Sequence, residues 1–441
     1  MFALVLPSAG RGRRLRLSIA VAGLCLAVAG ANAHAEPVLT FDRTLRLAQE
    51  RSRQLVAQDA SASASREMAV AAAQLPDPTI KAGINNLPIN GPDAFSTTRD
   101  FMTMRSIGVT QEFTRDDKRK ARAARFDREA QAAEAAREVA LANLQRDAAT
   151  AWLDRHYQER VRDLLDTQRD ETALQVEAAD AAYRGGRGSQ ADAFAARSAV
   201  ALIDARIRQA DIRVAASKTK LARWVGEDAR MALGEPPNLT EVGLDLRSLD
   251  SQLAHHPELA LMAKQEDVAR AEADVAQSNK HADWSVELMY SQRGPAYSNM
   301  VSLNVSIPWQ LDQRNRQDRE IAAKLAVAEQ MRAQREEAAR EHVAETRSWL
   351  QEWQGNRDRL ARYDSALIPL ATERTRAAIA AYRGGGPLSA VLEARRMEID
   401  TRMDRLRLEM ETAGLWARLN YLIPAGHDTA TPDHIATRTE K

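Results

Sequence analysis

The sequence predicts a mixed but mostly α-helical protein, in which long coiled-coil helices are combined with two amphipathic β-hairpins. Three observations predict this class. The 441 residues are 44% hydrophobic, 28% charged and only 5% aromatic, which is typical of long solvated helices. A stretch of 69 residues, from Arg115 to Tyr183, contains neither Pro nor Gly. Finally, the five residues 182–186 recur without change at 381–385, so the plan is repeated within the chain.

Residues 1–35 have the pattern of a secretory signal peptide. Four arginines precede an apolar stretch, residues 17–30, and Ala33 and Ala35 form an A-x-A cleavage site. The apolar stretch is short for a membrane-spanning helix, which needs about 20 residues. Removal of four Arg and no acidic residue changes the formal charge from +1 to −3 (1 − 4), so net charge gives no reason to expect a nucleic-acid partner.

The only cysteine, Cys25, lies inside this signal. A mature chain without a thiol has no disulfide, thiolate metal site or cysteine nucleophile. Leu24 precedes the cysteine where a lipoprotein signal needs a small residue, which argues against lipidation. Export without disulfides suggests a periplasmic or outer-membrane protein of a Gram-negative cell.

An internal duplication organises the rest of the chain. The repeated turn has an offset of 199 residues, and residues 106–110 match residues 302–306 at an offset of 196, with Phe113 falling on Trp309. We therefore expect a first repeat at 36–232, a linker at 233–248, a second repeat at 249–424 and a polar tail at 425–441. Each repeat is predicted to run helix, strand, strand, long helix, turn and helix.

The long helices are predicted from uninterrupted helical sequence. At about 1.5 Å per residue, residues 115–183 form a rod of roughly 100 Å. Its counterpart, residues 311–382, contains Gly355 and Pro369, and we expect a bend or a change of helix neighbour at Pro369. Residues 39–74 and 189–224 are each 36 long, so stacked end to end they match the rod.

Heptad spacing along the shorter helices predicts packing seams between helices and no chemistry. The two seams are Val200, Ile203, Ile207, Ala210, Val214, Ser217, Leu221 and Trp224, and then Ile399, Met403, Leu406, Met410, Ala413 and Ala417.

The predicted strands alternate apolar and polar residues, with the apolar side chains on one face. In the second half this face carries Trp284, Val286, Leu288, Tyr290, Val301, Leu303, Val305, Ile307 and Trp309. The first half carries a weaker copy with Ile80, Ala82, Ile84, Ile107, Val109 and Phe113, broken by Gln111. This is the pattern of a transmembrane β-barrel wall.

Four strands cannot close such a barrel, because single-chain barrels begin at about eight strands. Several protomers must then pool their hairpins. The alternative is a soluble hairpin that caps a coiled coil.

Taken together, the signal peptide, the repeated plan and the repeated turn resemble the outer-membrane efflux proteins of the TolC family, over about residues 39–424. The residues that carry this resemblance are His256–Leu259, Ser306–Trp309 and Ala381–Gly385.

The resemblance implies a homotrimer in the cell outer membrane, with one lipid-embedded β-barrel and a large periplasmic helical tunnel. It also implies two protein partners, a periplasmic adaptor (membrane fusion protein) and an inner-membrane pump of the resistance-nodulation-division type. The protein would then be a passive exit duct.

Under that resemblance, the two helix turns are the expected adaptor-docking tips, since small exposed tips allow an adaptor to pack closely. Their glycines also permit positive φ in a tight reversal. The tip residues are Tyr183, Arg184, Gly185, Gly186, Gly188, Tyr382, Arg383, Gly384 and Gly385.

Glu393 and Asp192 are the gate candidates, because three symmetry copies of a carboxylate would form an anion-repelling ring. Each is alternatively a solvated residue in an ion pair. Ala390 stands where a second gate carboxylate can occur, so a two-tier acidic gate is not expected.

No catalytic motif is present, so we predict that the protein is not an enzyme and carries no cofactor. His255 and His256 are adjacent, which on a helix is not a chelating arrangement, and we expect surface or cap positions for them.

Residues 75–78, 86–88 and 101–105 look similar to members of the family that accompany heavy-metal pumps, so we favour metal-cation export. The alternatives are export of organic compounds, including drugs, or type I secretion. A periplasmic adaptor is disfavoured because no lipoyl-like domain is evident, and a coiled-coil fibre because the amphipathic hairpins are present.

Overall fold

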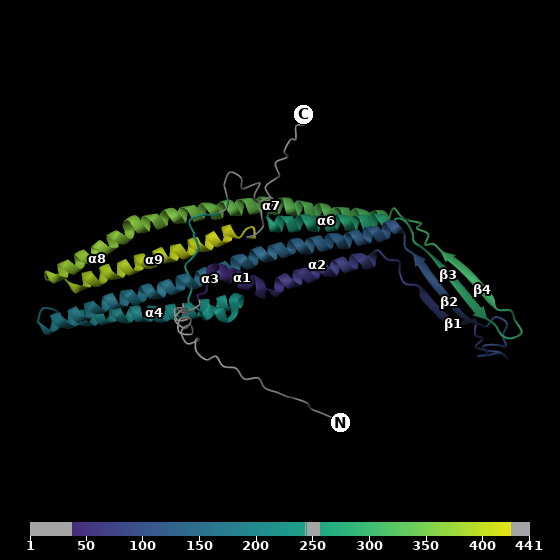
Figure 1. Cartoon of the computed structure of the whole chain (residues 1–441), viewed down its shortest axis with the longest axis horizontal. Helices are drawn as coiled ribbons and strands as arrows, with labels where there is room; N and C mark the ends of the chain where they lie inside the picture. Colours follow the sequence, from purple (N-terminus) through teal and green to yellow (C-terminus); the bar gives the residue numbers. More distant parts are fainter. Residues whose placement is uncertain (1–37, 243, 245–255, 425–441) are drawn as a thin grey trace, which may run out of the picture.

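The computed structural model describes residues 38–242, 244 and 256–424. The predicted signal peptide with Ala33 and Ala35, most of the second half of the linker, His255 and the predicted tail lie outside these residues. The molecule is long and narrow, with helices along its length, a sheet at one end and two helix turns at the other (Figure 1).

Both halves of the chain follow the order helix, strand, strand, long helix, turn and helix, although the first helical segment of the first half and the long helix of the second half are each divided. The first half contains α1 (Phe41–Arg51), α2 (Arg53–Ala72), β1 (Thr79–Asn85), β2 (Met104–Phe113), α3 (Asp116–Arg184), α4 (Gln190–Val225) and the 3₁₀ helix η1 (Gly226–Arg230). The second contains α6 (Pro257–Ser278), β3 (Trp284–Gln292), β4 (Met300–Ser306), α7 (Gln317–Arg362), the π-helical turn η2 (Tyr363–Leu367), α8 (Ile368–Arg383) and α9 (Leu388–Asn420).

Helix α3 confirms the predicted rod, since it runs 69 residues without interruption. Helices α2 and α4 lie along its two halves, as the matching lengths predicted (Figure 1). The prediction of one helix over residues 39–74 was wrong. Ser52 leaves the helical region with ψ 110°, and its hydroxyl accepts a hydrogen bond from the Leu55 amide, so it ends α1 and begins α2.

The counterpart rod bends near Pro369, where α7 passes into α8 (Figure 1). Its neighbour does not change there, because α7 packs against α6 in its first part and already against α9 further along, and α8 continues along α9. Of the two predicted outcomes, a bend or a change of neighbour, the bend is the one observed at Pro369. The chain does not break there, because a single π-helical turn just before Ile368 absorbs the backbone hydrogen bond that Pro369 cannot make. Gly355 lies within α7 without interrupting it.

The largest core lies where α1, α3, α4, α7 and α9 meet, about halfway along the helices. Trp152 is fully buried, and its indole N–H donates to the carbonyl of Leu39 at 3.1 Å. Trp416 similarly donates to the Glu241 carbonyl at 2.8 Å, which ties the linker to α9. The predicted seams of α4 and α9 are buried or half-buried, so the heptad interpretation is confirmed.

All four strands form one antiparallel sheet in the order β1-β2-β3-β4. The pairing of β2 with β3 joins the two predicted hairpins and places Phe113 opposite Trp284. Their rings stack at 4.4 Å between centroids. Strand β4 ends at Ser306, so the prediction that Ile307 and Trp309 continue the strand was wrong; both are nevertheless exposed, at 66% and 87%.

Candidate functional sites

One face of the sheet is apolar across all four strands. The register sets Ile80 opposite Val109, Val109 opposite Leu288, and Leu288 opposite Leu303, and residues directly opposite share a face. Most of these large apolar side chains are exposed in the single chain: Ile80, Ile84, Ile107, Val109, Trp284, Leu288, Tyr290, Val301, Leu303 and Val305. An exposed apolar surface of this extent indicates contact with another hydrophobic phase or chain.

Gln111 interrupts this face, as expected, opposite Val286. Its amide nitrogen donates to the carbonyls of Pro76 and Glu112 at 2.9 and 2.7 Å, at the helix end of the sheet.

The opposite face of the sheet is polar and centred on Glu287. This carboxylate pairs with Lys81 and accepts hydrogen bonds from Thr110 at 3.0 Å and Asn304 at 3.5 Å. Residues of β1, β2, β3 and β4 therefore meet in one polar network. One face of the sheet is mainly apolar and the other mainly polar, as the alternation of residues predicted.

The two helix turns at the far end of the molecule have nearly the same backbone. Gly186 and Gly385, at equivalent positions, both have positive φ, of 68° and 96°. Each amide donates to the carbonyl of the tyrosine three residues earlier, Tyr183 or Tyr382, at 3.0 Å. Glycine is required at these two positions because L side chains are strained at such φ values.

Other tip residues differ in their roles. Gly185 and Gly384 have φ −82°, which any residue adopts, so their predicted role in positive φ is wrong. At Gly188 a Cβ would lie 3.1 Å from that of Ala182, so close packing favours glycine. Arg184 and Arg383 end their helices exposed to solvent.

A small apolar cluster holds the two turns together. Ala179 and Ala196, from the α3–α4 hairpin, pack with Leu388 and Val391 of α9. Tyr382 packs against this cluster, whereas Tyr183 is 49% exposed. The two tips are therefore similar in backbone but present different surfaces.

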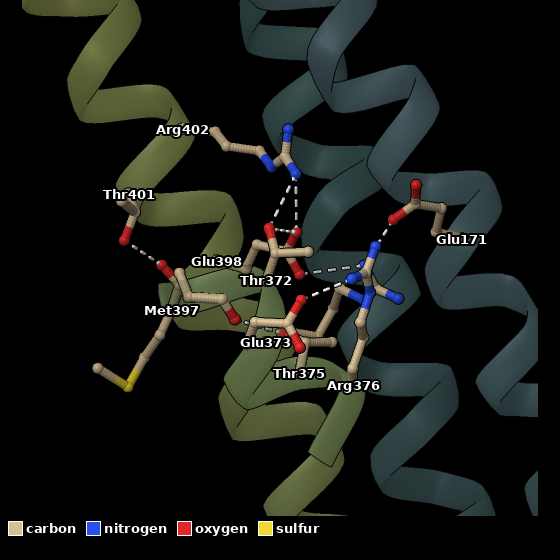
Figure 2. A network of polar contacts seen from close by, with 11 residues as sticks. Glu171, Thr372, Glu373, Thr375, Arg376, Met397, Glu398, Thr401 and Arg402 are labelled. Atoms are coloured by element: carbon tan, nitrogen blue, oxygen red, sulfur yellow. Dashed lines mark hydrogen bonds and ion pairs between the residues drawn. The ribbon is translucent and has the colours of Figure 1, made fainter. Parts of the chain in front are cut away.

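Behind this cluster lies a buried charge network on α9 that the sequence analysis missed (Figure 2). Glu398, with its side chain 4% exposed, accepts hydrogen bonds from Thr372 at 3.0 Å and Arg402 at 2.9 Å. Arg395 lies 3.3 Å from Glu398 and 2.5 Å from Glu171 of α3, so the network connects the α8–α9 and α3–α4 hairpins. No single-sequence signal separates these residues from the other charges of the helices, because their burial depends on three helices meeting.

Burial raises the pKa of Glu398, but hydrogen bonds from Thr375, Arg402 and Thr372 and the positive charge of Arg395 outweigh burial and hold the pKa below its ordinary range. The carboxylate is therefore ionised at neutral pH, and its charge is balanced by guanidinium groups.

The two gate candidates occupy different environments. Asp192 closes a capping box with Ser189, whose hydroxyl accepts from the Asp192 amide at 3.1 Å, and the hydrogen bonds from Ser189 lower the pKa of Asp192. Glu393 is 69% exposed and lies 3.8 Å from Arg374. Asp192 thus has a structural role at the start of α4, while Glu393 is free to face solvent.

Two histidines and a glutamate form another cluster, about halfway along the molecule, that was not predicted from the sequence. His256 caps α6, as the expected cap position implies, and lies against His342 of α7 with ring centroids 4.7 Å apart. His342 Nε2 is 2.9 Å from Glu258. Burial and the nearby His342 lower the pKa of His256 to about 4.

Within the described ranges, no helix is both long enough and apolar enough to cross a membrane.

Comparisons with known proteins establish the fold. The chain is similar to the outer-membrane channel OprN, with 14% identity over 87% of this chain and 89% of that chain and a TM-score of 0.72. For the outer membrane protein VceC of Vibrio cholerae the identity is 16%, the coverage 87% and 95%, and the TM-score 0.71. For CusC the identity is 15% over 86% of this chain and 91% of that chain, and the TM-score is 0.69.

No protein-family model matches the chain, and no curated protein matches it by sequence. The structural likeness confirms, at the level of the fold, the predicted resemblance to outer-membrane efflux proteins. The chain has the fold of an outer-membrane channel, in which a small antiparallel sheet is joined to very long helices.

Proposed function

We propose that the protein is an outer-membrane exit duct of a tripartite efflux system, which passively conducts substrate from an inner-membrane pump and a periplasmic adaptor to the exterior. The observation that carries the proposal is the four-stranded sheet with one exposed apolar face and one polar face, joined directly to helices of up to 69 residues. A sheet of this kind fits a barrel wall with lipid outside and water inside. Helices of this length fit a tunnel across the periplasm.

Trimerisation is the step that completes this duct. Strands β1 and β4 are the edges of the sheet in one chain, and an open edge in lipid leaves backbone groups unpaired. If β4 of one protomer pairs with β1 of the next, three copies close a barrel with no free edge. We further infer that the two halves arose by duplication, which the equivalent tip glycines and the shared element order support.

At the other end, the two turns are the proposed docking surface for the adaptor. Their backbones are similar, their glycines keep them small, and the exposed Tyr183 and arginines offer contacts. Glu393 is the stronger gate candidate, because its carboxylate is exposed whereas Asp192 is engaged in its cap. An inner-membrane pump of the resistance-nodulation-division type is the proposed energy source.

For the cargo, we favour heavy-metal cations. The support is the similarity of residues 75–78, 86–88 and 101–105 to the metal-exporting branch of the family.

The test of the proposal has two parts. In a sucrose gradient, the mature protein should band at outer-membrane density; recovery only in the soluble periplasmic fraction would contradict the duct. A deletion strain and its complemented parent should then be grown with copper, silver, zinc, cobalt, cadmium and nickel salts, and separately with dyes, detergents and antibiotics. Sensitivity restricted to metals supports the cargo, whereas sensitivity restricted to organic compounds would replace metals with drugs as the cargo and leave the duct unchanged.

A further inference from the structure

We infer that His256, Glu258 and His342 form a binding site for one divalent first-row transition-metal ion, such as Zn²⁺, in the helical wall of each protomer. The three residues come from two elements, the start of α6 and the middle of α7, and the fold brings them together. Their ligand atoms lie within 4.8 Å of one another. The inference concerns an ion held in the wall and does not depend on which cargo the duct conducts.

The donor set suits this class of ion. Two imidazole nitrogens and one carboxylate oxygen form the His₂Glu combination that binds Zn²⁺ in proteins, with a fourth position left for water. Metal–nitrogen and metal–oxygen bonds of about 2.0–2.2 Å place tetrahedral ligand atoms roughly 3.4 Å apart. The 2.9 Å separation of His342 Nε2 and the Glu258 carboxylate must therefore widen slightly, and any separation close to the 4.8 Å limit must shorten; rotation of the side chains can provide both.

The surroundings leave room for an ion and its water. The three residues line a cleft of about 460 Å³ between α3, α6, α7 and the end of α9. Glu345, three residues after His342 on α7, lines the same cleft and adds a carboxylate. Arg146 and Arg418 also line it, but Arg146 is paired with Asp147 at 2.9 Å and Arg418 stacks over Trp349. The carboxylates lining the cleft therefore outnumber the arginines by three to two.

One contact competes with the metal. The Nδ1 atom of His256 accepts a hydrogen bond from the Glu258 amide at 3.3 Å, which caps α6. A neutral imidazole that binds an ion through one nitrogen carries its proton on the other, so either mode of ligation replaces this hydrogen bond. The bond is long and its loss opposes binding only weakly.

The test is a direct binding measurement on the full-length protein, purified in detergent with a tag that contains no histidine. Equilibrium dialysis against Zn²⁺ should give one tightly bound ion per protomer. Co²⁺ should give the visible absorption bands of a tetrahedral site with nitrogen and oxygen ligands. His342→Ala and Glu258→Gln should each weaken Zn²⁺ binding at least about tenfold, since loss of a residue that only hydrogen-bonds to a metal ligand already costs about 10–100-fold.

Two further variants make the result specific. His256→Asn keeps an acceptor suited to the helix cap but removes the imidazole, so it should lose the metal without unfolding α6. His281→Ala removes an exposed histidine outside the cluster and should leave the stoichiometry unchanged. Circular dichroism of every variant shows whether the helices are retained.

Absence of Zn²⁺ binding to the native protein would overturn the inference, as would undiminished binding in folded His256→Asn and His342→Ala variants. In that case the cluster is an ion pair beside a helix cap. Neither outcome affects outer-membrane location or tolerance to toxic compounds, so failure of this inference and failure of the proposed function are distinguishable.

Discussion

Substitution of Leu288 by Arg tests whether the apolar face of the sheet contacts lipid. Leu288 is at the centre of that face, paired with Val109 on one side and Leu303 on the other, and its side chain is 49% exposed. An arginine at the midplane of a lipid-facing barrel wall costs about 2–4 kcal/mol. With three copies in a trimer, the total is roughly 6–12 kcal/mol, which is comparable to the whole stability of many folded domains.

The assay is the amount of trimer in outer-membrane fractions, measured by gradient centrifugation and electrophoresis without heating. Leu288→Arg should reduce assembled trimer severely, because the charge must enter the hydrocarbon layer. The matched control is Asn304→Arg on the neighbouring strand, whose side chain lies on the polar face, 3.5 Å from Glu287. There an arginine gains a carboxylate partner in water, and assembly should stay near that of the native protein.

Three results would refute this reasoning. Normal assembly of Leu288→Arg would mean that the face does not enter lipid. If Asn304→Arg alone failed to assemble into trimers, the two faces would be assigned the wrong way round. Equal loss of both variants would mean that the sheet tolerates no added bulk, whatever its surroundings.

The other predictions concern the opposite end of the molecule. Gly185→Trp combined with Gly384→Trp should abolish export but leave the trimer intact. The backbone φ is −82° at both positions, a value that tryptophan can adopt. Unchanged cross-linking of this double variant to the adaptor would count against tip docking. Glu398→Gln should destabilise the helices by about 1–3 kcal/mol. Arg395 keeps Glu171 as a counter-charge, but Arg402, whose side chain is 33% exposed, loses its charged partner. The exposed Glu393→Gln should shift the free energy of unfolding by less than about 0.5 kcal/mol while changing cation conductance in planar bilayers. The pKa of Glu398 is lower in the folded protein than the ordinary glutamate value of 4.5, so the ionised carboxylate stabilises the folded state. This stabilisation is complete above pH 4.5 and is lost as the pH falls through the lower pKa of the folded protein. The difference in melting temperature between native protein and Glu398→Gln should therefore shrink in that acidic range and remain constant above it.

Local patterns in the sequence were sufficient for most of the elements. The absence of Pro and Gly predicted α3 almost to the residue, since nothing in those residues interrupts the backbone hydrogen bonds. Two-residue alternation predicted which side chains share a face of the sheet, because the side-chain period of a strand is two whatever the strand pairs with. The break at Ser52 was missed because serine is tolerated within helices, and its role as a cap depends on a local backbone turn.

For the candidate sites, the sequence located the tips but not the chemistry around them. The repeated Tyr-Arg-Gly-Gly sequence marked both turns, yet the glycines with positive φ are the second of each pair, and no pattern distinguishes them from the first. Glu398 was overlooked because the chain contains 61 acidic residues and burial is what distinguishes this one.

What the sequence by itself determined is therefore local: helix length, strand alternation and the identity of the turns, each set by the backbone preferences of neighbouring residues. Tertiary structure alone decided which distant residues meet. Pairing of β2 with β3 merged two hairpins into one sheet, the contact of α9 with α3 and α8 buried Glu398 between arginines, and the packing of α6 on α7 placed His256 and Glu258 beside His342. Such contacts depend on the free energy of packing whole helices and strands together. A short stretch of neighbouring residues carries no information about that free energy.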